Sequence, residues 1–514
     1  MIIDGYSLTP AAVAAVARAC EPVELDAAAR GRVERDRTVV EDAVARQVPV
    51  YGLTTGLGER ANFVLPVEEL AGFSVRTVRG RANAVGPPLP RDVVRAALLV
   101  RCNGMAHGGS GIQPGVLDLL LAMLMMGVHP VVPETGSIGA SDLGQMAHIA
   151  LVAIGEGRAE YRGELLPAEV ALQRASLKAV VLGPKDGLAL CNSSALSAGL
   201  AALAYDDARK LLAAAQLVTT LSFEGLRANA TPLDPRVQAA RPVAGAQTCA
   251  AQLRQLLAGG QLLDTGAARR LQDPLSFRCA AQVHGSFHSA MGLLAGSLDP
   301  ELNGAGDNPL VLGEDREILS TGNFNTTALA LALDTVALAV FQTASISAQR
   351  TQRLLTSSLT GLPDNLSPHG SEHSGYAPLI KTVQALVSDM RHLSSPFSTD
   401  PRQGAALVED DASNAPAAAR RIGPMLDRLR YLLAIETVVA AQGVDLAAPG
   451  RIGHGPAALH QAVRERVIPL DEDRASADDI EQIAGDLFGP RVIETLLNQS
   501  GIGDSWSLGE RDGW

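Results

Sequence analysis

Apolar residues recur every three to four positions along most of this chain, and this spacing places them on one face of an α-helix. Between Thr9 and Arg46, Ala-rich segments dotted with charges predict two short helices, and Pro10 directly after Thr9 is typical of a helix start. Longer apolar periodicity predicts further helices at residues 91–103, 114–127, 143–153, 194–228, 326–355 and 420–441.

Short segments rich in glycine, asparagine and serine interrupt these helices. We expect polar, flexible sequence between Gly58 and Pro90, a hairpin-like insert around Arg162, and an acidic peripheral segment at residues 471–486. In a helical bundle such interruptions converge to build a pocket. The clearest breaks are residues 51–58, 108–111, 137–139 and 303–309.

Composition supports an all-α protein. Hydrophobic residues make up 47% of the 514 positions but aromatic residues only 3%, and alanine and leucine dominate, which favours helix over strand. We expect an elongated bundle of long helices with an active site built from its loops. The expected domains are residues 1–200, which carry both early glycine-rich loops, and residues 201–514, which carry the long-helix bundle and the C-terminal helices.

Charge and cysteine content limit which partners and which cellular compartment we expect. The net charge of −12 and the lack of a basic run argue against nucleic acid. The five cysteines are scattered, which indicates reduced thiols. No secretory signal is visible at Met1, residues 119–132 are shorter than a membrane span, and residues 325–347 carry Asp334. We therefore expect a cytoplasmic protein that does not enter a membrane.

Several familiar chemistries do not match. Ser141 lacks the glycine that a G-x-S-x-G nucleophile motif needs two positions later, and no phosphate-binding G-x-x-x-x-G-K-[ST] segment occurs. The pairs His284/His288 and His369/His373 have helical spacing, but neither has glutamate after the first histidine and no third ligand is evident. We predict no metal site.

Four polar residues within or beside the loops are candidates for chemistry, although each alone has a plain structural explanation. Tyr51 fits a capping aromatic, Asn192 a helix cap, Arg278 a surface or interface charge, and Glu409 a solvated acidic turn. Their order along the chain, with the segments around them, changes this interpretation.

The ordered set resembles the family of ammonia-lyases and aminomutases that act on aromatic amino acids, which includes histidine, phenylalanine and tyrosine ammonia-lyases. Each segment alone is a weak signal, but eight in the family's order are a strong one. They are Tyr51–Gly58, Gly136–Leu143, Asn192–Ser194, Gln272–Arg278, Asp307–Pro309, Gly322–Phe324, Ser374–Tyr376 and Glu409–Asp410.

The resemblance implies an electrophile that the chain makes from itself. In the family an Ala-Ser-Gly tripeptide cyclises and loses water to give a methylidene-imidazolone, the MIO group. Here the corresponding residues are Ala140, Ser141 and Asp142. Ser141 would become the methylidene and Ala140 would contribute the attacked carbonyl. A glycine-rich loop at a helix start suits this role, because backbone donors and the positive helix end stabilise negative charge.

The resemblance also implies roles for side chains. Tyr51 matches the base that removes the β-proton, and Arg278 matches the arginine that holds the substrate carboxylate through its two-pronged donors. Asn192 and Phe324 match residues beside the electrophile.

Further residues are implied to contact the substrate. Gln272 and Glu409 match polar residues near it. His107, with the adjacent Gly108, is a substrate-binding candidate because some tyrosine lyases carry a histidine that contacts the hydroxyl group of the substrate ring.

Three positions depart from the family pattern. The family reads Gly-Ala-Ser-Gly-Asp-Leu, whereas Ser141 here runs directly into Asp142 and Leu143, so one residue is missing. Either Asp142 substitutes for the glycine, or the electrophile does not form, or the written sequence represents a modified tripeptide imperfectly. Leu275 stands where the family commonly has tyrosine, and Asn325 follows Asn-Phe where histidine or glutamine is common.

These observations predict an ammonia-lyase that converts an L-aromatic or heteroaromatic α-amino acid into an α,β-unsaturated acid. A 2,3-aminomutase with the same electrophile, and a catalytically silent helical homologue that binds or assembles, remain alternatives. The resemblance implies a homotetramer whose subunits share active sites.

Overall fold

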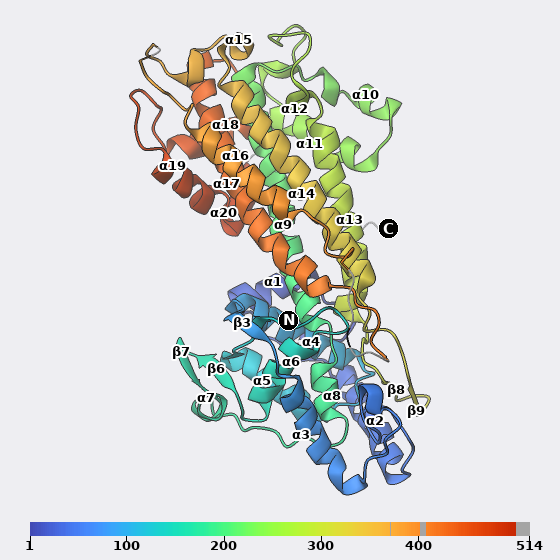
Figure 1. The fold of residues 1–514 in the computed structure, drawn as a ribbon. Helices are drawn as coiled ribbons and strands as arrows, with labels where there is room; N and C mark the ends of the chain where they lie inside the picture. The colour runs from blue at the N-terminus through green and yellow to red at the C-terminus, as the bar shows by residue number, and fades with distance from the viewer. Residues whose placement is uncertain (371, 401–403, 405–407, 500–514) are drawn as a thin grey trace. The chain divides into compact units, whose positions relative to one another are not determined.

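The computed structural model describes residues 1–370, 372–400, 404 and 408–499. Helices dominate these residues and their strands are no longer than four residues, so the predicted all-α bundle of long helices is confirmed (Figure 1). The chain divides into two compact units. Unit 1 comprises residues 1–206, 294–333 and 396–420; unit 2 comprises residues 207–293, 334–395 and 421–514.

Four of the five unit boundaries fall within long helices, and the fifth, between Ser395 and Pro396, lies outside any helix. The first boundary, after Asp206, lies close to the predicted domain limit at residue 200. Residues 294–333 and 396–420, which the sequence interpretation assigned to the second domain, belong to unit 1. The four helices are α9 (Ala195–Leu226), α13 (Ala280–Asn303), α14 (Thr327–Leu354) and α17 (Ala415–Ala447).

Among its described residues, unit 1 holds eight further α-helices. The N-cap of α1 is as predicted, since Thr9 accepts a hydrogen bond from the Ala12 backbone N–H and Pro10 occupies the first turn. The helices are α1 (Pro10–Ala19), α2 (Ala27–Ala45), α3 (Leu70–Arg81), α4 (Arg91–His107), α5 (Pro114–Met126), α6 (Leu143–Ala153), α7 (Ala168–Arg174) and α8 (Asp186–Cys191).

Short strands of unit 1 pair with one another and thereby connect its loops. β1 (Ile2–Ile3) pairs in parallel with β2 (Glu24–Leu25), and the other pairs are antiparallel. These are β3 (Val85–Pro88) with β5 (Pro133–Thr135), β4 (Val128–Pro130) with β6 (Arg158–Tyr161), β6 with β7 (Glu164–Pro167), and β8 (Leu310–Leu312) with β9 (Glu317–Leu319). The β6–β7 pair is the predicted hairpin-like insert.

Unit 2 is built around a buried ion pair. Arg350 and Glu436 are both fully buried, with Nε and Oε1 2.6 Å apart, and Ser222 and Ser347 donate further hydrogen bonds to the same carboxylate. A buried ion pair needs such extra hydrogen bonds to offset its desolvation. The remaining helices of unit 2 are α10 (Pro235–Ala240), α11 (Ala244–Leu257), α12 (Leu275–Arg278), α15 (Ser357–Thr360), α16 (Leu379–Leu393), α18 (His454–Arg464), α19 (Ala477–Gln482) and α20 (Pro490–Gln499).

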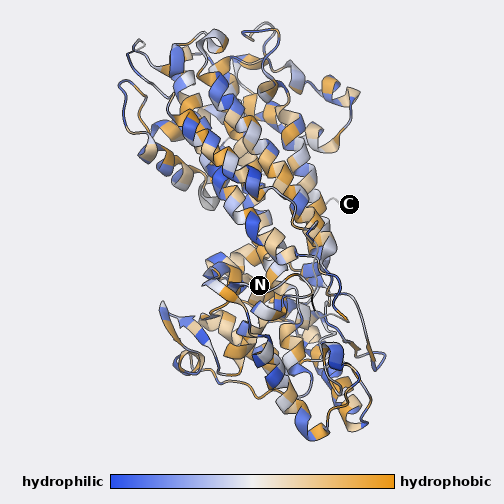
Figure 2. Ribbon diagram, viewed as in Figure 1, coloured by the Kyte–Doolittle hydropathy of each residue, from blue (hydrophilic) through white to orange (hydrophobic). Residues whose placement is uncertain are grey.

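Apolar content is high enough in two stretches to pass a membrane-span test by length and composition, namely Asp186–Leu226 and Thr327–Leu354. Their most apolar windows are 89% and 61% buried inside the described protein. Figure 2 shows that many helices carry both hydrophobic and hydrophilic residues. Because the core helices of soluble proteins pass the same test, these two stretches are weak evidence for a membrane.

Helix α3 was not predicted, since the polar sequence before Pro90 was interpreted as flexible. Tertiary packing fixes it, because α3 lies against both α6 and α8. The contact with α8 is close: a Cβ at Gly187 would lie 2.1 Å from the Ser74 carbonyl oxygen. The Ser74 hydroxyl also donates a 2.7 Å hydrogen bond to the Gly183 carbonyl. Contacts between distant segments, rather than apolar periodicity, therefore hold α3 in place.

Replacing Gly187 with alanine tests this packing. The added methyl group has no room against the Ser74 backbone, so we expect Gly187→Ala to destabilise the protein by about 1–3 kcal/mol. Thermal unfolding followed by circular dichroism measures the effect. Gly80→Ala, in α3 itself, is the matched control because its Cβ would meet nothing within 4 Å; its midpoint should stay unchanged or rise. Equal midpoints for both variants would contradict the close contact.

Candidate active site

A cavity of about 270 Å³ in unit 1 collects five of the residues singled out by sequence. They come from segments far apart in the chain, yet all line the same space. These residues are Tyr51, Ala140, Asn192, Phe324 and Glu409. The remaining lining residues are Leu57, Gly58, Ala61, Arg81, Leu143, Leu188, Asn308, Ser320 and Val408.

The loop that carries Ala140 is packed tightly against a second segment of unit 1. Gly139 has a φ of +90°, and a Cβ there would lie 2.3 Å from the Ser413 hydroxyl and 2.8 Å from the Asn414 backbone nitrogen. Glycine is therefore required at this position. The Asn414 N–H donates to the Ile138 carbonyl over 2.7 Å, and the Ser413 hydroxyl donates to the Gly139 carbonyl over 3.1 Å.

Ser141 and Asn192 form the central polar contact of the loop. The buried Ser141 hydroxyl donates to the Asn192 side-chain oxygen over 2.5 Å. The Asn192 amide nitrogen in turn donates to the Asn308 carbonyl over 3.0 Å. Asn192 follows α8 directly, so it links the end of that helix to both Ser141 and the Asn308 segment. The predicted placement of Asn192 beside the loop matches this geometry.

Asp142 does not line the cavity, because its side chain points to the first turn of α9. Its carboxylate accepts hydrogen bonds from the Ser197 backbone N–H at 2.8 Å and from the Ser197 hydroxyl at 2.9 Å. The Ser137 hydroxyl contributes a longer contact of 3.4 Å. The Asp142 backbone N–H donates to the Ser193 carbonyl over 2.8 Å. The carboxylate thus occupies the positive end of a helix, where negative charge is stabilised.

Burial raises the pKa of Asp142 to about 6, although the hydrogen bonds from Ser197 and Ser137 oppose the rise. The carboxyl group of Glu301, near the end of α13, also has a raised pKa of about 7, chiefly from burial and partly from the negative charge of Asp142. The carboxyl groups of Asp142 and Glu301 therefore both have raised pKa values and interact electrostatically. One of them is the residue that replaces the family's glycine.

Tyr51 is positioned by its own glycine-rich loop. The Gly58 backbone N–H donates to the Tyr51 phenol oxygen over 3.0 Å. This hydrogen bond fixes the phenol oxygen at the cavity wall. Thr54 fixes the preceding turn, since its hydroxyl group accepts from the Val50 N–H over 2.7 Å. The phenol therefore faces the cavity in a fixed position.

Phe324 and Glu409 belong to segments that hydrogen bonds attach to the loop. The Ser194 hydroxyl donates to the Phe324 carbonyl over 3.3 Å, and Ala140 forms an isolated β-bridge with Asn325. The Asn325 amide donates to the Asp411 carboxylate over 3.1 Å, two residues beyond Glu409. Asn325, where the family commonly has histidine or glutamine, thus connects these two segments.

Four other predicted site residues lie elsewhere. His107 and Gly108 line a different cavity of unit 1, of about 400 Å³, which shares no lining residue with the first. The His107 ring packs against the Tyr6 ring at an interplanar angle of 54°, with centroids 4.6 Å apart. Gln272 and Arg278 belong to unit 2, where Gln272 is exposed and the Arg278 Nε donates to the Asp273 carbonyl over 2.7 Å.

Sequence reasoning missed three polar residues of the cavity: Arg81, Asn308 and Ser320. Asn308 belongs to the Asp307–Pro309 motif, so the sequence did contain a signal that could have placed it at the site. Arg81 ends the unpredicted helix α3, and nothing in its local sequence distinguishes it from neighbouring arginines. It is the one lysine or arginine among the described residues that line this cavity.

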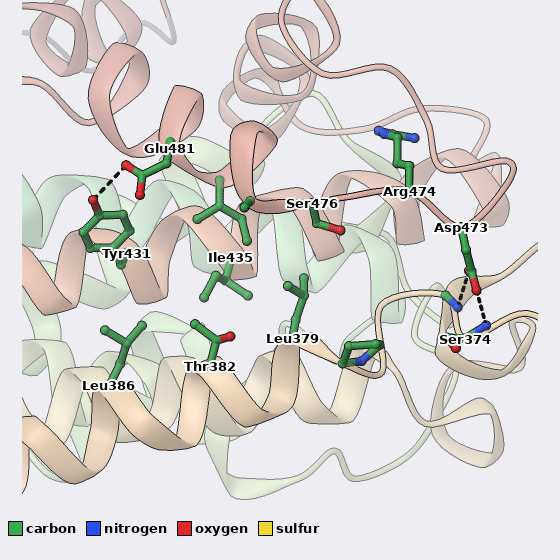
Figure 3. A pocket seen from close by; sticks show the side chains of 14 residues that line it. Ser374, Leu379, Thr382, Leu386, Tyr431, Ile435, Asp473, Arg474, Ser476 and Glu481 are labelled. Atoms are coloured by element: carbon green, nitrogen blue, oxygen red, sulfur yellow. Dashed lines mark hydrogen bonds between the residues drawn. The ribbon is translucent and has the colours of Figure 1, made fainter.

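A larger cavity, of about 570 Å³, lies in unit 2 and contains none of the predicted catalytic residues. Apolar side chains of α16, α17 and α19 form its walls, including Leu379, Ile435 and Ile480 (Figure 3). The Tyr431 hydroxyl there donates to Glu481 over 2.8 Å. Because size alone does not supply chemistry, the smaller cavity with its convergent polar groups is the candidate active site.

Comparisons with known proteins agree over nearly the whole chain. Residues 8–465 match the family model described as aromatic amino acid lyase. A histidine ammonia-lyase from Anaeromyxobacter sp. (strain K) is 42% identical over 495 residues, which are 94% of this chain and 97% of the relative.

Solved structures of two enzymes are similar throughout. The ergothionase of Treponema denticola, an ergothioneine-degrading enzyme, has a TM-score of 0.91 and 32% identity, and the match covers 97% of this chain and 99% of that one. The tyrosine aminomutase of Streptomyces globisporus has a TM-score of 0.90 and 30% identity, covering 97% and 98%.

The raised pKa of Asp142 predicts a pH-dependent stability. Its folded pKa of about 6 exceeds the ordinary aspartate value of 3.8, so this group's stabilising contribution is present at low pH and is lost as pH rises from about 4 through 6. Each unit of difference between the folded and unfolded pKa changes the free energy of unfolding by roughly 1.4 kcal/mol. In Asp142→Asn this dependence should disappear. Calorimetric unfolding between pH 4 and 7 measures it, and parallel curves for the two proteins would contradict the raised pKa.

Proposed function

We propose, from the premise that this chain belongs to the aromatic amino acid lyase family, that it eliminates ammonia from an L-α-amino acid with an aromatic or heteroaromatic side chain. The product is the corresponding α,β-unsaturated acid. Carbon–nitrogen lyase chemistry follows from the family. The observation that supports the site is the convergence of Tyr51, Ala140, Asn192, Phe324 and Glu409 on one cavity.

The residues of the loop fit the MIO group of the family. Its formation needs the Ala140 carbonyl, the Ser141 hydroxyl that leaves as water, and the backbone nitrogen of residue 142. The Asp142 side chain does not crowd this loop, because Ser197 and Ser137 hold it away from the cavity. The Ser193 carbonyl already accepts the Asp142 N–H. Once formed, the group supplies an electron-poor carbon that assists departure of the α-amine.

The side chains around the loop supply the remaining steps. Tyr51 removes the β-proton, and the Gly58 N–H holds its phenol oxygen at the cavity wall. Before the ring forms, Asn192 holds residue 141 in place by accepting a hydrogen bond from the Ser141 hydroxyl, a contact that ends when this hydroxyl leaves as water. Phe324 packs beside the reacting residues, and Glu409 offers a polar contact to the substrate.

Arg278 and Gln272 are proposed to bind the substrate from unit 2, with the guanidinium of Arg278 pairing with the α-carboxylate. Their membership of unit 2 is compatible with a homotetramer in which neighbouring subunits complete each site. We also place the enzyme in the cytoplasm. His107 and Gly108 remain substrate-binding candidates, but they would contact a ligand in the separate cavity that they line.

An aminomutase is the second candidate, and the similarity to the tyrosine aminomutase structure favours it. Such an enzyme uses the same residues but adds the amine back at the β-carbon before release. A silent homologue is the third reading, and the glycine position occupied by Asp142 is the feature that favours it. The experiments below separate all three.

Intact mass spectrometry tests the electrophile. If Ala140, Ser141 and Asp142 cyclise, the purified protein should be lighter than the unmodified chain by two water molecules and should absorb in the near ultraviolet. Ser141→Ala, which has no hydroxyl to lose, is the control and should show the unmodified mass. Finding the wild-type chain at its unmodified mass would reject the group and support the silent homologue.

Tyr51→Phe tests the base. The variant keeps the ring but cannot accept the β-proton, so ammonia release should fall by about 10²–10⁴-fold. Ammonia and β-amino acid are quantified together across a panel that includes L-histidine, L-phenylalanine and L-tyrosine. Unchanged turnover in Tyr51→Phe would remove this residue from the mechanism. Production of β-amino acid without ammonia by the wild type would identify an aminomutase.

A further inference from the structure

Helix α12, which carries Arg278, is too short to be stable by itself. It spans only the four residues Leu275–Arg278, whereas an isolated helix of fewer than about 12 residues is already marginal in water. Among the described residues, Arg278 Nε donates to the Asp273 carbonyl, and Arg278 Nη1 and Nη2 make no hydrogen bond. These two terminal nitrogens can grip a carboxylate only if other parts of unit 2 fix α12.

Contacts with distant segments of unit 2 hold α12 in place. The Asp273 carboxylate accepts a hydrogen bond from the Asn229 backbone N–H over 2.6 Å, and the ring of Phe277 is buried. A further contact reaches the backbone of the helix itself, because Arg350 Nη1 donates to the Ser276 carbonyl over 3.3 Å. The donor of this last contact is a charged side chain that is fully buried.

The guanidinium of Arg350 is itself fixed by Glu436. Nε lies 2.6 Å from Oε1 and Nη2 lies 3.0 Å from Oε2, so both carboxylate oxygens are engaged. Ser222 of α9 and Ser347 of α14 each donate to the same carboxylate over 2.6 Å. A bidentate contact determines orientation as well as distance. Three long helices, α9, α14 and α17, therefore determine that Nη1 points to the Ser276 carbonyl.

Stability is a weak explanation for this ion pair. Both side chains are fully buried, and the cost of taking two charges out of water often exceeds the gain from pairing them. Apolar residues of similar size are often equally stable or more stable in such a place. A buried ion pair does impose a fixed geometry, and here that geometry extends to the segment that carries Arg278.

We propose that Arg350 is a positioning residue for substrate binding, which holds the Ser276 carbonyl and thereby directs Nη1 and Nη2 of Arg278 to the substrate α-carboxylate. This inference rests on the proposed function, which assigns that carboxylate to Arg278. Ser276 stands two residues before Arg278 in a single helical turn, so a shift of its carbonyl shifts the arginine as well. Because Arg350 is fully buried, its loss should weaken recognition of the carboxylate and leave recognition of the ring unchanged.

Binding of reaction products in the absence of ammonia measures this positioning. Calorimetry gives the Kd values of cinnamate and urocanate and of the two corresponding amides, which keep the ring but lack the negative charge. Wild type should bind each acid more tightly than its amide. Arg278→Met should lower this preference by about 10- to 100-fold, the effect of a lost charged hydrogen bond. In Arg350→Met/Glu436→Leu the preference should fall by at least about 5-fold, with amide binding unchanged.

Both partners of the ion pair are replaced together because Arg350→Met alone leaves the Glu436 charge buried without its partner and is expected to unfold the protein. Thermal unfolding checks that the double variant is folded. A merely structural role would weaken acids and amides alike. A second readout adds Arg278→Met to the double variant, which should lower the preference no further than Arg278→Met alone. Additive losses would show that the two arginines act independently and would overturn the proposal.

Gln216→Leu/Gln252→Leu is the matched control. It removes another buried hydrogen-bonded pair of unit 2, in which Gln216 Nε2 of α9 donates to Gln252 Oε1 of α11 over 2.7 Å. Its preference for the acids should equal that of wild type. An unchanged preference in Arg350→Met/Glu436→Leu overturns the proposal, and so does an equal loss in the control.

These measurements also separate the positioning role from the proposed function. If both Arg278→Met and the double variant lose the preference for the acids, the role of Arg350 is supported even when no amino acid is turned over. If only Arg278→Met loses it, the role of Arg350 is rejected while substrate binding by Arg278 stands. A wild type that binds acids and amides equally overturns both roles, and ammonia release then tests the lyase reaction by itself.

Discussion

The Asp142 carboxylate is buried at the first turn of α9, where the backbone N–H and hydroxyl of Ser197 both donate to it. Burying an ionised carboxylate is expensive unless hydrogen bonds and a favourable dipole replace its water. Here both are present. The same residue begins α6, and its backbone N–H donates to Ser193. One residue thus joins the loop, α6 and the start of α9, and the geometry of the cavity follows from that junction.

A second set of buried charges holds the segment of Asn308, which lines the cavity. Arg101 in α4 donates to both carboxylate oxygens of Asp307, at 2.9 and 3.1 Å, and also to the Ala189 carbonyl in α8. Asp307 precedes Asn308, whose carbonyl accepts from Asn192. A bidentate arginine contact fixes orientation as well as distance. The Arg101 guanidinium therefore fixes α8 and the Asp307–Asn308 segment relative to each other. The Asn192 side chain, which is attached to both, is held in place, and so is its hydrogen bond with Ser141.

Sequence patterns predicted the parts of the fold that local chemistry determines. Long apolar periodicity located α9, α14 and α17, and glycine placed the breaks before α5 and α6. The order of motifs predicted a shared site for several loops, and those of Tyr51, Ala140, Asn192, Phe324 and Glu409 line one cavity, whereas the Gln272–Arg278 segment belongs to unit 2 and does not line it. Helix α3 escaped prediction because its position depends on contacts with α6 and α8, which are distant in sequence. Arg81 was missed with it. His107 ends α4 as the glycine break predicts, but periodicity does not tell which cavity a helix end faces.

The loop lacks the glycine that the family pattern has between serine and aspartate. Because the Asp142 carboxylate is buried, this absence has a physical consequence. In the family pattern a glycine separates serine from the aspartate, so one residue provides the ring nitrogen and the next provides the side chain. Here Asp142 would have to do both. Because its carboxylate is fixed at α9, its backbone nitrogen has few positions open to it, whereas a separate glycine has many. Any ring that forms must form in the geometry that Ser197 and Ser193 impose. If the ring closes, the anchoring of a side chain and the closure of a backbone ring, which the family assigns to two residues, are therefore coupled in this chain through a single Cα atom.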